Sequence, residues 1–346
     1  MLTPRHRWVG ALVVGMAVLC PAARAADVKY LPDDAELVFT VNLKQIRTSE
    51  RVMKETDALD QPRAALNRLA DDLPVLKCLQ IAGLDFFRDL TSITFAAPAG
   101  KKPRAKFLIL EGDFDALKLT DLLADRAKAS PDALKVGPSG GAVVYEMGTA
   151  AETRNYAVLV NKTTLIAATT REALADALAR SDGSKKSGLK PGLKTLLQAA
   201  SETESISFAA TGLALALLLD GSSIPNAETA AAALKSVDGL TGAVTLAKDV
   251  QFQVGIYARD DETAKKLAAA GGNALLTLRG LLKQKAKEDE KLLPAVGIVN
   301  TLRIRNQGPI LLLAGEATLD AIEKLMKNAP VGQTEAGPAP PESGGA

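Results

Sequence analysis

The sequence predicts an α+β protein built from two tandem pseudo-repeats, each of the order strand, helix, hairpin, helix, hairpin, helix, with antiparallel sheets that carry helices on one face. Short runs of alternating apolar and polar residues, typical of half-buried strands, are interleaved with segments whose apolar residues recur at helical spacing. The same order of segments returns in the second half of the chain. A chain of 346 residues, 47% hydrophobic and 24% charged, is long enough for one large domain or two modest ones with a core.

In the first half, the clearest strand pattern is at residues 36–43, where Leu37, Phe39 and Val41 lie on one side. Further strands are expected at 92–97, 107–110, 142–147, 156–160 and 165–169, with helices from about Asp115 and Thr170.

The second half repeats this order. It has a strand at 205–212, an apolar segment at 213–219, a hairpin of 240–247 with 250–258, a helix from Asp261, a hairpin of 301–306 with 310–314, and a final helix containing Leu319. Two consecutive glycines, Gly271 and Gly272, leave open whether the helix from Asp261 is interrupted.

Changes in composition divide the chain. A polar, Gly/Ser-rich stretch lies between the halves, and a Pro/Gly-rich stretch with little to bury ends the chain. The predicted organisation is a signal peptide at 1–25, a first α+β repeat domain at 26–182, a linker at 183–190, a second repeat domain at 191–330 and a disordered tail at 331–346.

The N-terminus has the parts of a secretory signal peptide: basic residues, an apolar run at 8–20, and Ala-Arg-Ala at 23–25. The run is shorter than the roughly 20 residues that a membrane-spanning helix needs. Because Leu19 is not the small residue expected before a lipidated Cys20, we expect simple cleavage before Ala26 and export to the periplasm or beyond. An uncleaved membrane anchor is the alternative.

Cleavage would remove the single histidine His6, the single tryptophan Trp8, and Cys20, one of two cysteines. Catalytic arrangements that need histidine and the usual imidazole metal ligands are then excluded, and Cys78 has no partner for an internal disulfide. We therefore expect no enzyme activity, no cofactor, no metal site and a buried, unreactive Cys78. Lys plus Arg falls from 42 to 39 against 40 acids, and aromatic residues are only 4%, which disfavours nucleic-acid binding.

Carboxylates are the remaining catalytic groups. Asp113 and Asp115, and later Asp260, lie where an apolar strand ends and a helix begins, so we interpret them as helix caps. A carboxylate-based hydrolase is the competing hypothesis. The Gly-x-Ser-x-Gly pattern at 137–141 precedes a strand-like segment and no histidine is available, so it is interpreted as a turn.

Alternation in two strands gives the one candidate binding surface. Polar side chains share one face of each strand, with apolar residues at the intervening positions: Gln251, Gln253 and Tyr257 in the first, Arg303 and Arg305 in the second. Packing of the two halves against each other, or simple hydration, would account for the same pattern.

The opening Tyr30-Leu31-Pro32-Asp33-Asp34-Ala35-Glu36-Leu37-Val38-Phe39 resembles the start of uncharacterised secreted bacterial proteins built from duplicated α+β units. The resemblance implies an extracytoplasmic protein and carries no site residues. The leading expectation is a non-catalytic envelope protein that binds or scaffolds an unknown protein or envelope component, with no stable membrane span after cleavage. The alternative is a carrier of an apolar small molecule or lipid, since the segment 211–219 is apolar on all sides.

Overall fold

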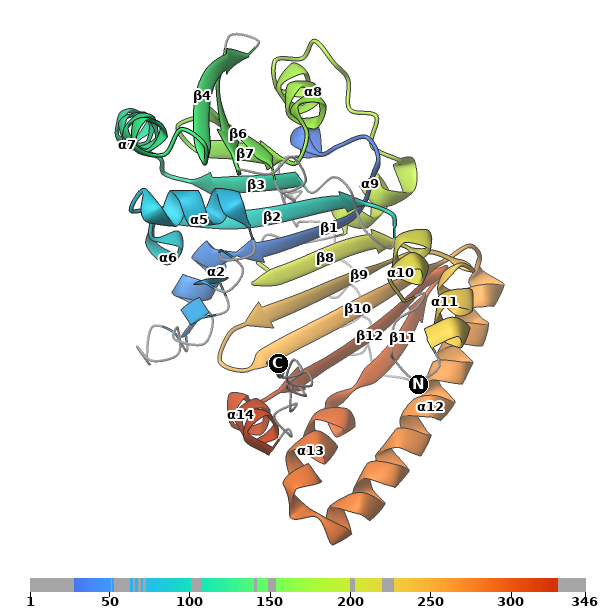
Figure 1. Ribbon diagram of the computed structural model, residues 1–346. Helices are drawn as coiled ribbons and strands as arrows, with labels where there is room; N and C mark the ends of the chain where they lie inside the picture. The colour runs from blue at the N-terminus through green and yellow to red at the C-terminus, as the bar shows by residue number, and fades with distance from the viewer. Residues whose placement is uncertain are drawn as a thin grey trace, which may run out of the picture.

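A computed structural model describes residues 28–50, 52, 63–64, 66–67, 70, 73–100, 107–139, 142–148, 154–199, 203–219 and 227–328. These residues form one antiparallel sheet in the order β11-β12-β10-β9-β8-β1-β2-β3-β7-β6-β5-β4 (Figure 1). The strands are β1 (Ala35–Asn42), β2 (Leu90–Pro98), β3 (Phe107–Gly112), β4 (Leu134–Ser139), β5 (Ala142–Met147), β6 (Asn155–Asn161), β7 (Thr164–Ala168), β8 (Ile206–Thr211), β9 (Val237–Leu246), β10 (Val250–Ala258), β11 (Arg303–Gln307) and β12 (Ile310–Ala317). The α+β class and the antiparallel sheet are confirmed.

The helices connect the strands and cover the sheet. They are η2 (Val28–Tyr30), α2 (Leu43–Thr48), α5 (Pro74–Ile81), α6 (Phe86–Asp89), α7 (Ala116–Ala129), α8 (Arg171–Ser181), α9 (Pro191–Gln198), α10 (Gly212–Leu219), α11 (Ala227–Leu234), α12 (Asp261–Glu288), η5 (Glu290–Leu292), α13 (Leu293–Thr301) and α14 (Leu319–Asn328). The helix from Asp261 runs through its two glycines without a break.

The two halves of the chain meet in the middle of this single sheet. β1 pairs with β8 in antiparallel register, and Phe39 lies directly opposite Phe208. A helix follows each central strand, and its N-cap side chain, Asn42 or Thr211, accepts a hydrogen bond from the backbone N–H three residues later. The halves therefore extend one sheet in opposite directions, so they do not pack face to face.

Helices cover both faces of the first half, so the expectation of helices on one face is wrong there. One face packs against α2, α5, α6 and α7, and the other packs against η2, α8 and α9. β3 shows the reason: Phe107, Leu108, Ile109 and Leu110 are all buried, so consecutive side chains are apolar on both faces. A continuous apolar run, in contrast to alternation, is the pattern of a strand covered on both sides.

Residues of the predicted linker contact Asp33, close to the first described residues of the chain. The carboxylate of Asp33 accepts a 2.7 Å hydrogen bond from the backbone N–H of Gly188 and forms ion pairs with Lys185 and the buried Arg180. Arg180 also donates to the backbone oxygen of Tyr30. We refer to these contacts as the Asp33 clasp. The domain boundaries themselves stay predictions, and residues 1–25 and 331–346 lie outside the described residues.

The C-terminal end of the sheet is less completely covered. α12 buries only Ala264 and Ala286 among its 28 residues, whereas Leu276 and Leu281 are 64% and 54% exposed. In α13 no residue is buried. As Figure 1 shows, α12 and α13 extend beyond the strands as a pair of helices. α12 lies beside Ile304, whereas the candidate site lies on the other face of the last strands, which carries Arg305 and Gln253.

Candidate binding surface

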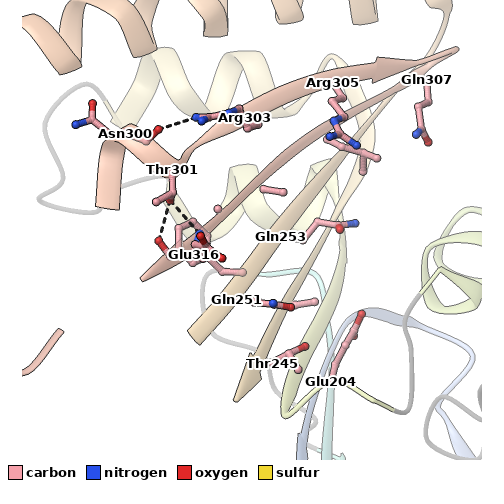
Figure 2. Close-up of a pocket in the computed structure, with 15 residues that line it drawn as sticks. Glu204, Thr245, Gln251, Gln253, Asn300, Thr301, Arg303, Arg305, Gln307 and Glu316 are labelled. Carbon is pink, nitrogen blue, oxygen red and sulfur yellow. Dashed lines mark hydrogen bonds between the residues drawn. The ribbon is translucent and has the colours of Figure 1, made fainter. Parts of the chain in front are cut away.

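A hollow of about 670 Å³ lies on one face of the sheet at β9, β10, β12 and β11 (Figure 2). We call it the sheet-face hollow. Its polar lining includes Thr245, Gln251, Gln253, Arg303, Arg305 and Glu316. Because side chains alternate between the two faces of a strand, residues two apart in each strand point into the same space. A volume of this size is within the range of about 300 to 1,000 Å³ that is typical of ligand sites.

The strand register explains why these side chains meet. Gln253 lies opposite Ala314 on one side, and Ala314 lies opposite Arg303 on the other. One row therefore crosses β10, β12 and β11, and the small alanine in its middle leaves room between the glutamine and the arginine. Gln251 and Glu316 form the next row towards the end of the strands.

The two arginines differ in how they are held. Nη1 of Arg303 donates to the backbone oxygens of Asn300 at 2.6 Å and Leu302 at 2.9 Å. Carbonyl oxygens at the C-terminus of a helix attract cations, so the end of α13 fixes this guanidinium. The side chain of Arg305 is exposed and makes no hydrogen bond or ion pair with the described residues. The two together give the β11 side of the hollow a positive charge.

A side-chain hydroxyl joins α13 to the sheet beside the hollow. Oγ1 of Thr301 donates to the backbone oxygen of Glu316 at 2.8 Å and accepts from its backbone N–H at 3.0 Å. Figure 2 shows these bonds at the lower end of β12. They fix the distance between α13 and β12, so this wall of the hollow is preformed.

Four of the five candidate residues from the sequence, Gln251, Gln253, Arg303 and Arg305, line the sheet-face hollow together. Tyr257 does not. It shares their face of β10 but is half-buried against the core cluster that contains α9 residues, and burial raises the pKa of its phenol despite a hydrogen bond with Thr241. Whether the four residues bind a ligand stays a prediction.

Sequence reasoning missed several lining residues, among them Gln307 and Glu316. A signal for both was present. Gln307 continues the alternation of Arg303 and Arg305, and the two-residue Gly308-Pro309 loop pairs Gln307 with Ile310. Counting outward along this hairpin from its turn fixes which residues of β12 face the arginines.

Two of the three carboxylates at the strand-to-helix joints act as helix caps, as predicted, whereas Asp113 precedes the N-cap of α7 and is not itself a cap. Asp115 accepts from the backbone N–H of Lys118 at 3.0 Å, and Asp260 accepts from that of Thr263 at 2.7 Å. Asp113 and Asp115 do border a cavity of about 130 Å³, together with Asp89. The side-chain hydrogen bond between Arg88 and Asp89 holds the pKa of Asp89 below its usual range. A general acid needs a raised pKa instead.

The other chemical groups take structural positions. Cys78 in α5 is half-buried beside the core, and burial raises the pKa of its thiol. Among the described residues no group of three or more His, Cys, Asp or Glu side chains is arranged to hold a metal ion. Ser139 of the Gly-x-Ser-x-Gly pattern lies in β4, paired with the first residue of β5, and residues 140–141 lie outside the described residues.

The apolar segment 211–219 forms α10 beside β8 and β9. It is not buried on all sides: Ala214 and Ala216 are covered, whereas Leu213 and Leu218 are about half exposed. In the described part of the chain, no helix has both the length and the hydropathy of a membrane span.

No family model and no curated protein matches this chain. Solved structures of a protein named TP0453 resemble it at 10 to 11% identity. Crystal form III covers 90% of this chain and 99% of the other with a TM-score of 0.46, and crystal form I covers 87% and 96% with a TM-score of 0.45. Scores this low carry no inference about function, and the resemblance to secreted bacterial proteins stays a prediction.

Proposed function

We propose that this protein is a non-catalytic, exported binding module that holds a partner protein against the sheet-face hollow. The observation that carries the proposal is the convergence of Gln251, Gln253, Arg303 and Arg305, from two separate hairpins, on one preformed space of about 670 Å³. Side chains that can both donate and accept hydrogen bonds, beside two guanidinium groups, suit a polar or acidic partner.

Comparison of the two halves supports a specific role for this surface. Phe39 and Phe208 face each other at the centre of the sheet, so the residue before each of them begins an equivalent row of paired residues. One row crosses the strands of the first half, and the other crosses the strands of the second half. The first-half row is Val38, Ala96, Phe107 and Ala168, and the second-half row is Ser207, Ala243, Gln253 and Ala314. The first row is apolar and fully buried under helices, whereas Gln253 in the second row is exposed.

We interpret the two halves as diverged copies of one unit. The order of strands outward from the central pair is the same for β2, β3, β7, β6 and for β9, β10, β12, β11. If the halves share an origin, the second half has lost the helices that bury this face of the sheet in the first half. Loss of apolar cover together with gain of polar side chains is expected for a surface that another molecule occupies.

A non-catalytic role fits the available side chains. The chain without its predicted leader has no histidine, and Asp115 and Asp260 cap helices. The same leader supports placement in the periplasm or outside the cell. The carrier alternative has weaker support, because Leu213 and Leu218 of α10 are about half exposed and the lining of the sheet-face hollow is mainly polar residues.

The test is to fill the hollow with the residue that fills it in the first half. Gln253→Phe copies Phe107, and Lys283→Gln, at an exposed position of α12, is the matched control. Residues 26–346 of each form are immobilised and exposed to an envelope extract of the native host. We expect one protein to be retained by the unmodified and control forms and lost with Gln253→Phe. Equal retention by all three forms, or saturable turnover of any substrate, would overturn the proposal.

A further inference from the structure

The edge of the sheet beside the hollow is open. β11 is the last strand in the order, and among the described residues no strand pairs with its outer side. Gly308, with a φ of +59°, and Pro309 form the two-residue turn into β12, which closes on the pair Gln307 and Ile310. Because bonded and non-bonded pairs alternate in an antiparallel ladder, the N–H and C=O groups of Ile304 and Asn306 point to the open edge.

A second hollow lies on the opposite side of β11. It has a volume of about 610 Å³ and separates β11 from α12, and its lining combines apolar residues with Asn273, Arg279, Asn300 and Arg303. Its lining includes Ala268, Gly272, Leu275, Leu276, Leu302 and Ile304. We call it the helix-side hollow. Arg279 of α12 donates to the backbone oxygens of Val299 and Leu302, which holds α12 at a fixed distance from the strand.

The edge strand thus separates a hollow lined mainly by polar residues from one whose lining contains a larger share of apolar residues. Arg305 borders the sheet-face hollow, Ile304 borders the helix-side hollow, and Arg303 borders both. Any extended segment that pairs with β11 would direct alternate side chains into these two spaces, since its own side chains alternate with a period of two.

We propose that β11 receives an extended segment of the partner protein as an additional strand, with acidic side chains alternating with apolar ones. This inference rests on the proposed function and names the partner chemistry. Backbone hydrogen bonds to Ile304 and Asn306 supply affinity that does not depend on sequence, and the two hollows supply the selection. Carboxylates at alternate positions pair with Arg303 and Arg305, and the intervening apolar side chains cover Ile304 and Leu276.

A second copy of this chain is a poor occupant of the same edge. Antiparallel pairing of β11 with itself keeps equivalent side chains on the same face. Arg303 and Arg305 of one copy would then lie across from the arginines of the other, and like charges directly opposite each other destabilise a strand pair. The charge of the edge therefore favours an acidic partner over self-association.

The test measures binding of labelled synthetic decapeptides to residues 26–346 by fluorescence anisotropy. The probe alternates Glu and Val, and the comparison peptides carry the same residues in two blocks or alternate Lys and Val. We expect the alternating acidic peptide to bind at least about tenfold more tightly than either comparison, which corresponds to about 1.4 kcal/mol. Its affinity should fall with added salt, because the paired charges are at the rim of the site.

Variants of the protein separate the two hollows. Arg305→Glu should weaken binding of the acidic peptide about tenfold and strengthen binding of the Lys–Val peptide. Gly272→Leu places a side chain in the helix-side hollow, where no atom lies within 4 Å of the added Cβ, and should abolish binding. Gly280→Leu on the same helix is equally unobstructed but lies outside the hollow, so it should bind as the unmodified protein does.

The outcomes distinguish the two proposals. Equal affinity for the alternating and block peptides, or identical behaviour of Gly272→Leu and Gly280→Leu, would overturn strand addition. So would concentration-dependent dimers of the unmodified protein whose affinity changes in Arg305→Glu, because they would place a second copy on this edge. If Gln253→Phe still blocks retention of the native partner in any of these cases, the proposed function stands and only the strand-addition inference fails.

Discussion

The Asp33 clasp gives a prediction whose size follows from the structure. The side chain of Arg180 is 1% exposed, and Asp33 is its ion-pair partner at 3.4 Å. Replacing Asp33 by alanine leaves this cation buried without a countercharge, a change that costs about 3 to 5 kcal/mol in fully buried pairs. Because the Asp33 side chain is 34% exposed, water screens the pair, and we expect the Asp33→Ala variant to lose about 2 to 3 kcal/mol.

Urea unfolding of residues 26–346 measures this loss. Arg180→Met, which removes the cation and keeps an apolar side chain of similar length, is the matched control. The double variant should be more stable than Asp33→Ala, because no unpaired charge remains. A free energy of unfolding for Asp33→Ala within about 0.5 kcal/mol of the unmodified protein would refute the idea that the carboxylate compensates Arg180.

The same clasp predicts a pH dependence. Burial raises the pKa of Asp33, but the hydrogen bond from Gly188 and the charges of Lys185 and Arg180 outweigh burial and hold the pKa below its usual value. A lowered carboxyl pKa contributes stability that is complete above the unfolded pKa of about 3.9 and is lost as the pH falls through the folded pKa. Asp33→Asn should therefore destabilise the protein at pH 6 and lose less stability than the unmodified protein below about pH 4. Parallel pH profiles would contradict this.

Three further predictions concern packing, capping and reactivity. Gly242→Ala should destabilise the protein by about 2 kcal/mol, because the added Cβ would lie 1.9 Å from the ring of Phe208. Gly280→Ala, at an exposed position of α12, should stabilise the protein by about 0.5 to 1 kcal/mol. Urea unfolding measures both changes. Asp260→Ala removes the N-cap of α12 and should lower the melting temperature in a calorimetric scan. Asp260→Ser keeps a side-chain acceptor at the N-cap and should have a melting temperature close to that of the unmodified protein. The Cys78 thiol should react slowly with a disulfide reagent at pH 8 and rapidly in urea, since burial raises its pKa, and equal rates would show that it is accessible in the folded protein.

Local patterns in the sequence predicted most of the strands. β5 at 142–147 and β10 at 250–258 have the expected bounds, because alternation of apolar residues and flanking turns are properties of the local chain. β4, α5 and α9 were not predicted. α5 and α9 are only eight residues long and carry no side-chain N-cap, and β4 contains Gly137 and Pro138, which suit a turn as well as an edge strand.

The candidate site, too, was predicted only in part from local patterns. Alternation placed Gln251, Gln253, Arg303 and Arg305 on polar strand faces, and the hairpin turns fixed which positions are opposite each other. Alternation is a property of one strand, and it separates two faces without saying what covers either of them. Tyr257 packs near α9, whereas Gln253 remains exposed in the sheet-face hollow. This difference depends on helices that are distant from both residues in the sequence.

By itself, the sequence determined the α+β class, the capping aspartates and the polar stripe of the last hairpins, because each depends on residues within a few positions of one another. Only the tertiary structure decided that β1 pairs with β8 to make one sheet, that helices cover both faces of the first half, and that β11 ends the sheet between two hollows. These features depend on contacts between distant segments, and the free energy of burying apolar surface, which is non-directional, does not specify which segments meet.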